Sequence, residues 1–175
     1  RNLINESSLK KLGICIPTYN RSNLLDRLLK SIPSIDDIMI SICDDGSEDN
    51  THQIVKNHQS RISINYSYQE NRGRAAALRK SILNAKAEFI MIVDSDDYFE
   101  EKGVEIIYDT LKKNPSINFF VFPTKIINNL KSKSISLSGI PKINYLSLRS
   151  DYKVKYDLQE VIRSKLLLDI LYDDP

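Results

Sequence analysis

Residues 88–99 read EFIMIVDSDDYF, and this stretch decides the fold class. An apolar run, 89–93, is followed by three carboxylates, Asp94, Asp96 and Asp97. An unbroken apolar run of this length predicts a strand that is buried on both faces, as in a parallel sheet. Three acids after that strand would repel one another unless a cation lies among them, and oxygen ligands suit Mg2+ or Mn2+. An acidic turn that caps a helix is the alternative.

Strand and helix patterns alternate along the rest of the chain. Strands are predicted at residues 12–16, 38–43, 62–68, 89–93 and 117–122, and helices at 23–32, about 50–59, 71–85 and 103–113. This alternation predicts crossover units, and therefore an α/β fold with three layers, an α/β/α sandwich around a mostly parallel, Rossmann-like sheet.

The C-terminal third has a weaker pattern. Residues 125–148 are rich in Ser, Lys, Asn and Ile without a helical period, and we expect short strands and loops there. Residues 157–171 carry an apolar stripe that predicts one helix. Without a repeat or a linker that would mark a second domain, the 175 residues are expected to form a single structural domain.

Composition excludes several classes of protein. A net charge of +2 is too small to attract nucleic acid, and no apolar run approaches the roughly 20 residues of a membrane span.

Cys15 and Cys43 fall in predicted strands and are expected to be buried thiols, with one disulfide as the alternative. His52 and His58 are expected at the surface, and a zinc site is not expected. No signal peptide is visible at the start of the sequence, and Arg1 in place of Met suggests an excised piece of a longer protein.

Polar or acidic segments follow three of the predicted strands. They are residues 17–20, 44–47 and 94–97. In open parallel sheets ligands bind beyond the carboxyl ends of the strands, so the three segments are expected to meet at one binding edge.

The same segments carry a resemblance. Pro17-Thr18-Tyr19-Asn20 follows the first strand, Asp44-Asp45-Gly46-Ser47 the second, and Asp94-Ser95-Asp96-Asp97 the fourth, while Asn71 and Gly73 open the Ala-rich helix. Each motif is short, but the ordered set resembles the family 2 glycosyltransferases, an inverting group with a GT-A fold. The resemblance covers about residues 12–122.

This resemblance implies a nucleotide-diphosphate sugar as donor, most often linked to UDP. Pro17 would hold Thr18 and Tyr19 under the base, and the Tyr19 ring would stack on a pyrimidine. A carboxylate of Asp44 or Asp45 would accept the imide N–H of uracil. The expected nucleotide-binding residues are Pro17, Thr18, Tyr19, Asn20, Asp44, Asp45, Arg72, Gly73, Asp94 and Ser95, and either Arg72 or Arg74 would reach the diphosphate.

The resemblance also implies a metal and an acceptor base. Asp96, with Asp97 or water, would hold Mn2+ or Mg2+, and Asp94 is the third candidate ligand, nearest the ribose. The base that deprotonates the acceptor hydroxyl usually comes from an acidic pair well beyond the metal motif. The later pair in this chain, Asp173 and Asp174, is a weak candidate because it comes too early, so a shortened chain that lacks the base is expected.

For the whole protein, the resemblance implies transfer of a sugar with inversion to a carbohydrate or lipid-linked acceptor in cell-surface polysaccharide synthesis. Residues 1–124 would be the nucleotide-sugar-binding half, and residues 125–175 the start of an incomplete acceptor-side region. The expected location is the cytoplasm, with at most peripheral contact at the inner membrane face. The sequence does not decide between a monomer and a homo-oligomer.

Three other interpretations require different sequence features. A dinucleotide-dependent oxidoreductase would carry G-x-G-x-x-G after the first strand, where this chain has Pro-Thr-Tyr-Asn. A nucleotidyltransferase would usually place a phosphate loop rich in Gly and in Arg or Lys there. A donor-binding module without transfer activity stays open, because the expected base is lacking.

Overall fold

The computed structural model describes residues 9–127, 132–135 and 158–172. The main sheet has the strand order β3-β2-β1-β4-β9-β6. Its strands are β1 (Lys10–Thr18), β2 (Ile38–Asp44), β3 (Ile64–Tyr68), β4 (Ala87–Ile92), β6 (Phe119–Pro123) and β9 (Leu158–Arg163). A smaller sheet joins β5 (Tyr98–Phe99), β8 (Ser132–Ile135) and β7 (Lys125–Ile127). The helices are α1 (Ser22–Ser31), α2 (Thr51–His58), α3 (Arg74–Asn84), α4 (Gly103–Lys113) and α6 (Ser164–Tyr172).

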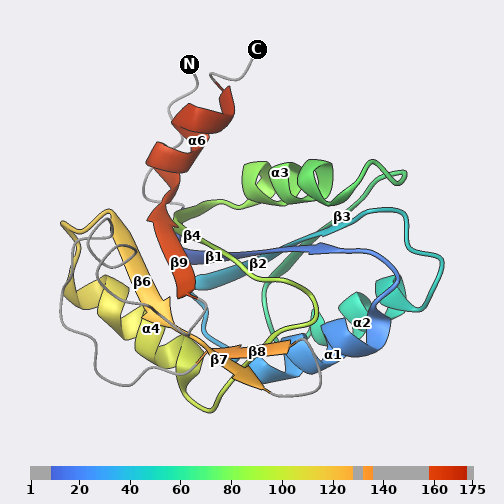
Figure 1. The fold of residues 1–175 in the computed structure, drawn as a ribbon, viewed down its shortest axis with the longest axis horizontal. Coiled ribbons are helices and arrows are strands. Elements are labelled where there is room, and N and C mark those ends of the chain that lie inside the picture. The colour runs from blue at the N-terminus through green and yellow to red at the C-terminus, as the bar shows by residue number, and fades with distance from the viewer. Residues whose placement is uncertain (1–8, 128–131, 136–157, 173–175) are drawn as a thin grey trace.

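Helices cover both faces of the sheet (Figure 1). On one face, Ile82 of α3 and Leu167 of α6 pack in the same apolar cluster as Ile90 of β4. On the other, the larger cluster takes in α1 and α4, for example Leu28 and Ile107. Strands β3, β2, β1 and β4 pair in parallel, which confirms the predicted three-layer sandwich with a mostly parallel sheet.

Strand β1 shows why these residues form a central strand. Leu12, Ile14 and Ile16 are fully buried and belong to the larger cluster, whereas Cys15 belongs to the smaller cluster on the α3 face. Alternate residues of a strand point to opposite faces, so an uninterrupted apolar run suits a strand covered on both sides.

The prediction of one helix over residues 157–171 is wrong in its first half. Residues 158–163 form β9, which pairs antiparallel with β4 on one side and β6 on the other. Val161 is fully buried there, opposite Met91 and Phe120. Spacing alone fitted a helix, but pairing with two strands and burial of β-branched side chains outweigh that local pattern. The helical second half corresponds to α6.

Two further predictions concern single residue types. Both cysteines are buried and unpaired with each other, as expected, and burial raises the pKa of the Cys15 thiol to about 12. The surface prediction is confirmed for His52 and wrong for His58. His58 is only 8% exposed, and its Nε2 atom lies 2.8 Å from Asp26 Oδ1 on α1. That tertiary partner is invisible in the local sequence.

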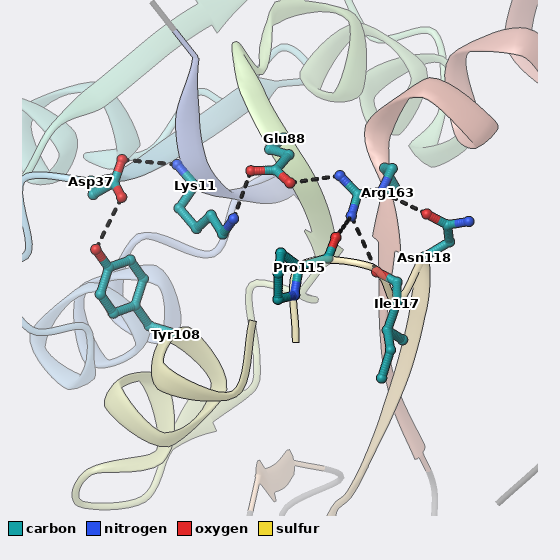
Figure 2. Close-up of polar contacts among 8 residues, drawn as sticks. All are labelled: Lys11, Asp37, Glu88, Tyr108, Pro115, Ile117, Asn118 and Arg163. Atoms are coloured by element: carbon teal, nitrogen blue, oxygen red, sulfur yellow. Dashed lines mark hydrogen bonds and ion pairs between the residues drawn. The ribbon is translucent and has the colours of Figure 1, made fainter. Parts of the chain in front are cut away.

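A polar network at the amino edge of the sheet holds β9 in place (Figure 2). Lys11 Nζ and Arg163 Nη1 approach the two oxygens of Glu88 at 2.7 and 2.6 Å. Arg163 also donates to the carbonyl of Pro115 at 2.5 Å and to Asn118 Oδ1 at 2.7 Å. Burial alone would raise the pKa of Glu88, but these cations outweigh it and lower the pKa below its usual value.

Candidate active site

The carboxyl ends of β1, β2 and β4 meet at the edge of the sheet opposite this network, and an open pocket of about 470 Å3 lies there. We call it the carboxyl-edge pocket. It is lined by Pro17, Thr18, Tyr19, Arg21, Asp45, Asn71, Gly73, Arg74, Ala77, Asp94, Ser95 and Asp96. Residues from all three predicted segments contribute to it. Its volume falls within the range of about 300–1,000 Å3 that is usual for ligand pockets.

The loops after β1 and β2 support each other. The Asp45 N–H donates to the Thr18 carbonyl at 2.9 Å, which joins the two strand ends. Asn20, with φ of 49°, donates its N–H to Ser47 Oγ and accepts from the Glu48 N–H, both at 2.8 Å. Asn20 therefore braces the two loops and is not among the residues that line the pocket.

Of the two aspartates after β2, only Asp45 lines the carboxyl-edge pocket. Asp44 is 1% exposed, and its carboxylate accepts hydrogen bonds from the Ser47 N–H at 2.9 Å and the Tyr66 hydroxyl at 2.7 Å. Burial and the hydrogen bond to Asp44 raise the pKa of Tyr66, which keeps the phenol protonated as a donor. Asp44 thus shapes the loop from within.

Asp45 fixes the approach to α3. Its Oδ1 atom accepts hydrogen bonds from Gln69 Nε2 at 2.7 Å and from the main-chain N–H of Arg72 at 2.8 Å. Arg72 is held through its backbone and does not line the pocket, whereas Arg74 does. Gly73 caps α3 with φ of 88°, a left-handed conformation that favours glycine. The first turn of α3 therefore begins at the pocket wall.

Arginines hold the acidic segment. The Asp94 carboxylate is ion-paired with the Arg74 guanidinium. Arg21 Nη1 lies 3.0 Å from Asp96 Oδ2, and Arg27 Nη2 donates to the main-chain carbonyl of Asp96 at 2.5 Å. These arginines offset the mutual repulsion of the acids and orient the segment at the pocket.

Asp94 and Asp96 bring hard oxygen donors into the carboxyl-edge pocket. Within residues 9–127, 132–135 and 158–172, no three His, Cys, Asp or Glu side chains are grouped so that they could hold a metal ion by themselves. Mg2+ is commonly bound through one or two carboxylates together with substrate phosphates, without a complete cage of protein ligands. The two aspartates fit a divalent ion of that kind, which a bound phosphate would complete.

Thr18 carries an orphaned polar atom at this pocket. The residue is 4% exposed, and within the described part of the chain its Oγ1 has no hydrogen-bond partner. A buried hydroxyl without a partner is costly, which makes Thr18 Oγ1 a candidate to bond a ligand at this pocket. Beside it, the Tyr19 ring is 45% exposed and accessible for stacking.

A second pocket, of about 300 Å3, adjoins the first, and the two share Arg74 and Asp94. Its walls come from α3, β4, β9 and α6. Asp97, which is 8% exposed, lines this second pocket and not the first. The three predicted metal ligands are therefore divided between the two pockets, with Asp94 common to both.

The structure brings nine of the predicted site residues to the carboxyl-edge pocket: Pro17, Thr18, Tyr19, Asp45, Gly73, Arg74, Asp94, Ser95 and Asp96. It places Asn20, Asp44, Arg72 and Asp97 outside its lining, and Asp173 and Asp174 lie outside the described residues. Sequence reasoning missed Arg21 and Ala77, and it named Asn71 only as part of the motif that opens the Ala-rich helix. Arg21 directly follows the Pro-Thr-Tyr-Asn segment, and that position was the available signal.

The fold and the carboxyl-edge pocket place the chain among α/β proteins that bind a ligand at the ends of parallel strands. Residues 13–165 match the family model described as glycosyl transferase family 2, and the chain belongs to this family. The predicted family is thereby confirmed.

Similar curated proteins support the same family assignment. A poly-beta-1,6-N-acetyl-D-glucosamine synthase of Staphylococcus epidermidis is 30% identical over 143 residues, which cover 78% of this chain and 33% of the relative. A chondroitin synthase of Escherichia coli is 32% identical over 120 residues, covering 65% of this chain and 18% of the relative. A match to an uncharacterized glycosyltransferase of Mycoplasma genitalium covers 38% of that relative. The chain therefore spans well under half the length of these three relatives.

Among solved structures, residues 1–349 of Staphylococcus aureus TarS superpose with a TM-score of 0.72 at 23% identity, covering 91% of this chain and 49% of that chain. This likeness concerns the fold, and it confirms the expected GT-A architecture. Across the described segments, no helix combines the length and apolar character needed to cross a membrane.

Proposed function

We propose that the carboxyl-edge pocket binds a nucleotide-diphosphate sugar, most often UDP-linked, and that the whole protein transfers the sugar to an acceptor hydroxyl with inversion. The observation that carries this proposal is the joining of Tyr19, Asp45 and Asp96, from three separate loops, in one pocket. TarS, which shares the fold, has been crystallised with UDP and with UDP-GlcNAc, and this supports a uridine donor.

The base would lie against the β1 end of the pocket. The exposed Tyr19 ring offers a stacking surface worth roughly 1–3 kcal/mol per base. Asp45, oriented by Gln69 and the Arg72 N–H, would accept the imide N–H of uracil, which the ring nitrogen of cytosine lacks at neutral pH. Thr18 Oγ1 would gain the partner that it lacks in the described structure.

The diphosphate would lie against the start of α3. The positive end of the helix dipole and the Arg74 guanidinium both favour an anion there. Asp94 and Asp96 would hold a divalent ion, which stabilises the charge that develops on the departing nucleoside diphosphate. Arg21 and Arg74, now paired with these aspartates, are in place to turn towards phosphate oxygens. A mannosyltransferase of Pyrobaculum calidifontis with a TM-score of 0.54 was solved with GDP-Man and Mn2+.

The remaining parts of the proposal rest on the family. Residues 1–124 would form the donor half and residues 125–175 would begin the acceptor side, although β9 inserts between β4 and β6 of the same sheet. The base for the acceptor hydroxyl is assigned to no described residue. A role in polysaccharide synthesis is in keeping with the name of the S. epidermidis relative, and its assignment to the cell surface rests on the family resemblance alone.

Calorimetry with UDP, GDP and CDP, each with and without Mn2+, tests the proposal. We expect UDP to bind most tightly, and only in the presence of Mn2+. Asp96→Asn should weaken this binding at least about 10-fold, since it removes an anionic ligand of the ion. Asp109→Asn, at an exposed position of α4, is the matched control. Unchanged UDP affinity in Asp96→Asn would reject the assignment.

A further inference from the structure

The second pocket has an aliphatic floor. Leu78 of α3, Ile92 of β4, Ile162 of β9 and Leu167 of α6 line it, and each of these side chains is partly exposed. Partly exposed aliphatic side chains from four elements form a surface that gains free energy when a ligand removes it from water. Such an apolar surface beside a polar pocket suits a ligand with an apolar group.

The rim of the second pocket is acidic. Asp94, Asp97 and Glu160 contribute three carboxylates, and Arg74, which is ion-paired with Asp94, contributes a cation. This balance disfavours a negatively charged sugar inside the second pocket, while carboxylates accept hydrogen bonds from hydroxyl groups. The ligand that fits is therefore uncharged and rich in hydroxyls.

We infer that the second pocket receives the sugar of the donor and selects an uncharged sugar that carries a small apolar substituent, such as the methyl of an acetamido group. This inference rests on the proposed function of the carboxyl-edge pocket. The two pockets meet at Arg74 and Asp94, so a diphosphate held at that pair leads its sugar into the second pocket. A volume of about 300 Å3 lies at the small end of ligand pockets, as expected for one monosaccharide.

The positions of the polar side chains in the second pocket support a sugar as its ligand. Gln159 Nε2 donates to the carbonyl of Ile92 at 2.8 Å, which ties the start of β9 to the end of β4. Glu160 and Ile162 alternate along β9 and so point to one face of the sheet, where they present a carboxylate and an aliphatic group to the same recess. Such a pocket can contact both the hydroxyl groups and the apolar substituent of a sugar.

Calorimetry in Mn2+ with UDP, UDP-Glc and UDP-GlcNAc tests this inference. We expect UDP-GlcNAc to bind at least about 10-fold more tightly than UDP-Glc, because even one methylene in an apolar pocket gives roughly 10- to 200-fold discrimination. Leu167→Asn should reduce that ratio to near 1 and leave the affinity for UDP unchanged. Leu166→Asn, at the neighbouring position that is 45% exposed, should keep the ratio.

A second variant does not depend on the packing of α6. Wild-type protein should bind UDP-glucuronate at least about 10-fold more weakly than UDP-Glc, and Glu160→Gln should narrow this gap, since it removes one negative charge from the rim. The inference is overturned if UDP binds but the acetamido and hydroxyl sugars bind equally, or if neither variant changes sugar preference. Failure of UDP itself to bind wild-type protein would instead overturn the proposed function, and this inference with it.

Discussion

Arg163, the last residue of β9, lies 2.6 Å from Glu88 near the start of β4. This pair (Figure 2) sits at the amino edge of the sheet, yet it bears on the site at the opposite edge. Strand β9 runs antiparallel from the second pocket to Arg163, so fixing Arg163 fixes the register that presents Glu160 and Ile162 to that pocket.

Arg163→Met should lower the free energy of unfolding by about 2–4 kcal/mol, because it removes one of the two cations that pair with the partly buried Glu88 carboxylate and the donor to the Pro115 and Asn118 acceptors. Urea unfolding followed by circular dichroism measures this. Lys165→Met, at an exposed position of α6, should change stability by less than about 0.5 kcal/mol. Equal effects of the two variants would show that the network is not what holds β9.

The same pair predicts a pH dependence. Since the folded pKa of Glu88 lies below its usual value, its ion pairs contribute stability above the unfolded pKa of about 4.3, and this contribution is lost as pH falls through the folded pKa. The stability difference between wild type and Glu88→Gln should be about 1–3 kcal/mol at pH 7 and shrink progressively as pH falls below about 4. Urea titrations across this range measure it, and a constant difference would contradict the prediction.

Thr18→Val should weaken nucleotide binding without lowering the stability of the fold. Removing the partnerless Oγ1 costs no hydrogen bond of the described structure, so the free energy of unfolding should stay equal or rise by up to about 1 kcal/mol. Affinity for UDP should fall by about 3- to 10-fold if this hydroxyl bonds the nucleotide. Thermal melts paired with calorimetry test both parts, and an unchanged affinity would leave Thr18 as a packing residue.

Two glycines near the pocket should respond differently to alanine. Gly46 has φ of 89°, and a Cβ there would lie 2.9 Å from the Asn71 backbone nitrogen. Gly73 has a similar φ of 88°, but its Cβ would meet open space. We expect Gly73→Ala to cost about 1 kcal/mol of strain and Gly46→Ala about 2–3 kcal/mol. Urea unfolding distinguishes them, and equal losses would mean that Asn71 moves aside without cost.

Sequence reasoning located most of the architecture because the apolar pattern is local. Each of β1, β2 and β4 is a short apolar run, and the helices that follow have a regular stripe. It failed at β9, where Leu158, Val161 and Ile162 have a spacing that a helix also satisfies. Only the hydrogen bonds to β4 and β6 distinguish the two structures, and those partners lie far away in the chain.

The residues of the site also fall into those that local sequence predicts and those that depend on distant contacts. The motifs after three strands identify the loops that meet at the carboxyl edge, since parallel strands end on the same side. The motifs could not say which of Asp44 and Asp45 turns into the core, because that depends on the Tyr66 hydroxyl of the next strand.

The amino-acid sequence by itself therefore determined the class of fold, the family and the edge of the sheet where the site lies, because these follow from local periodicity and the order of motifs. Only the tertiary structure decided how the acids are divided between two pockets, which arginines pair with them and that β9 supplies a wall. Those features depend on contacts between residues distant in sequence, and no local pattern encodes the partner of a side chain.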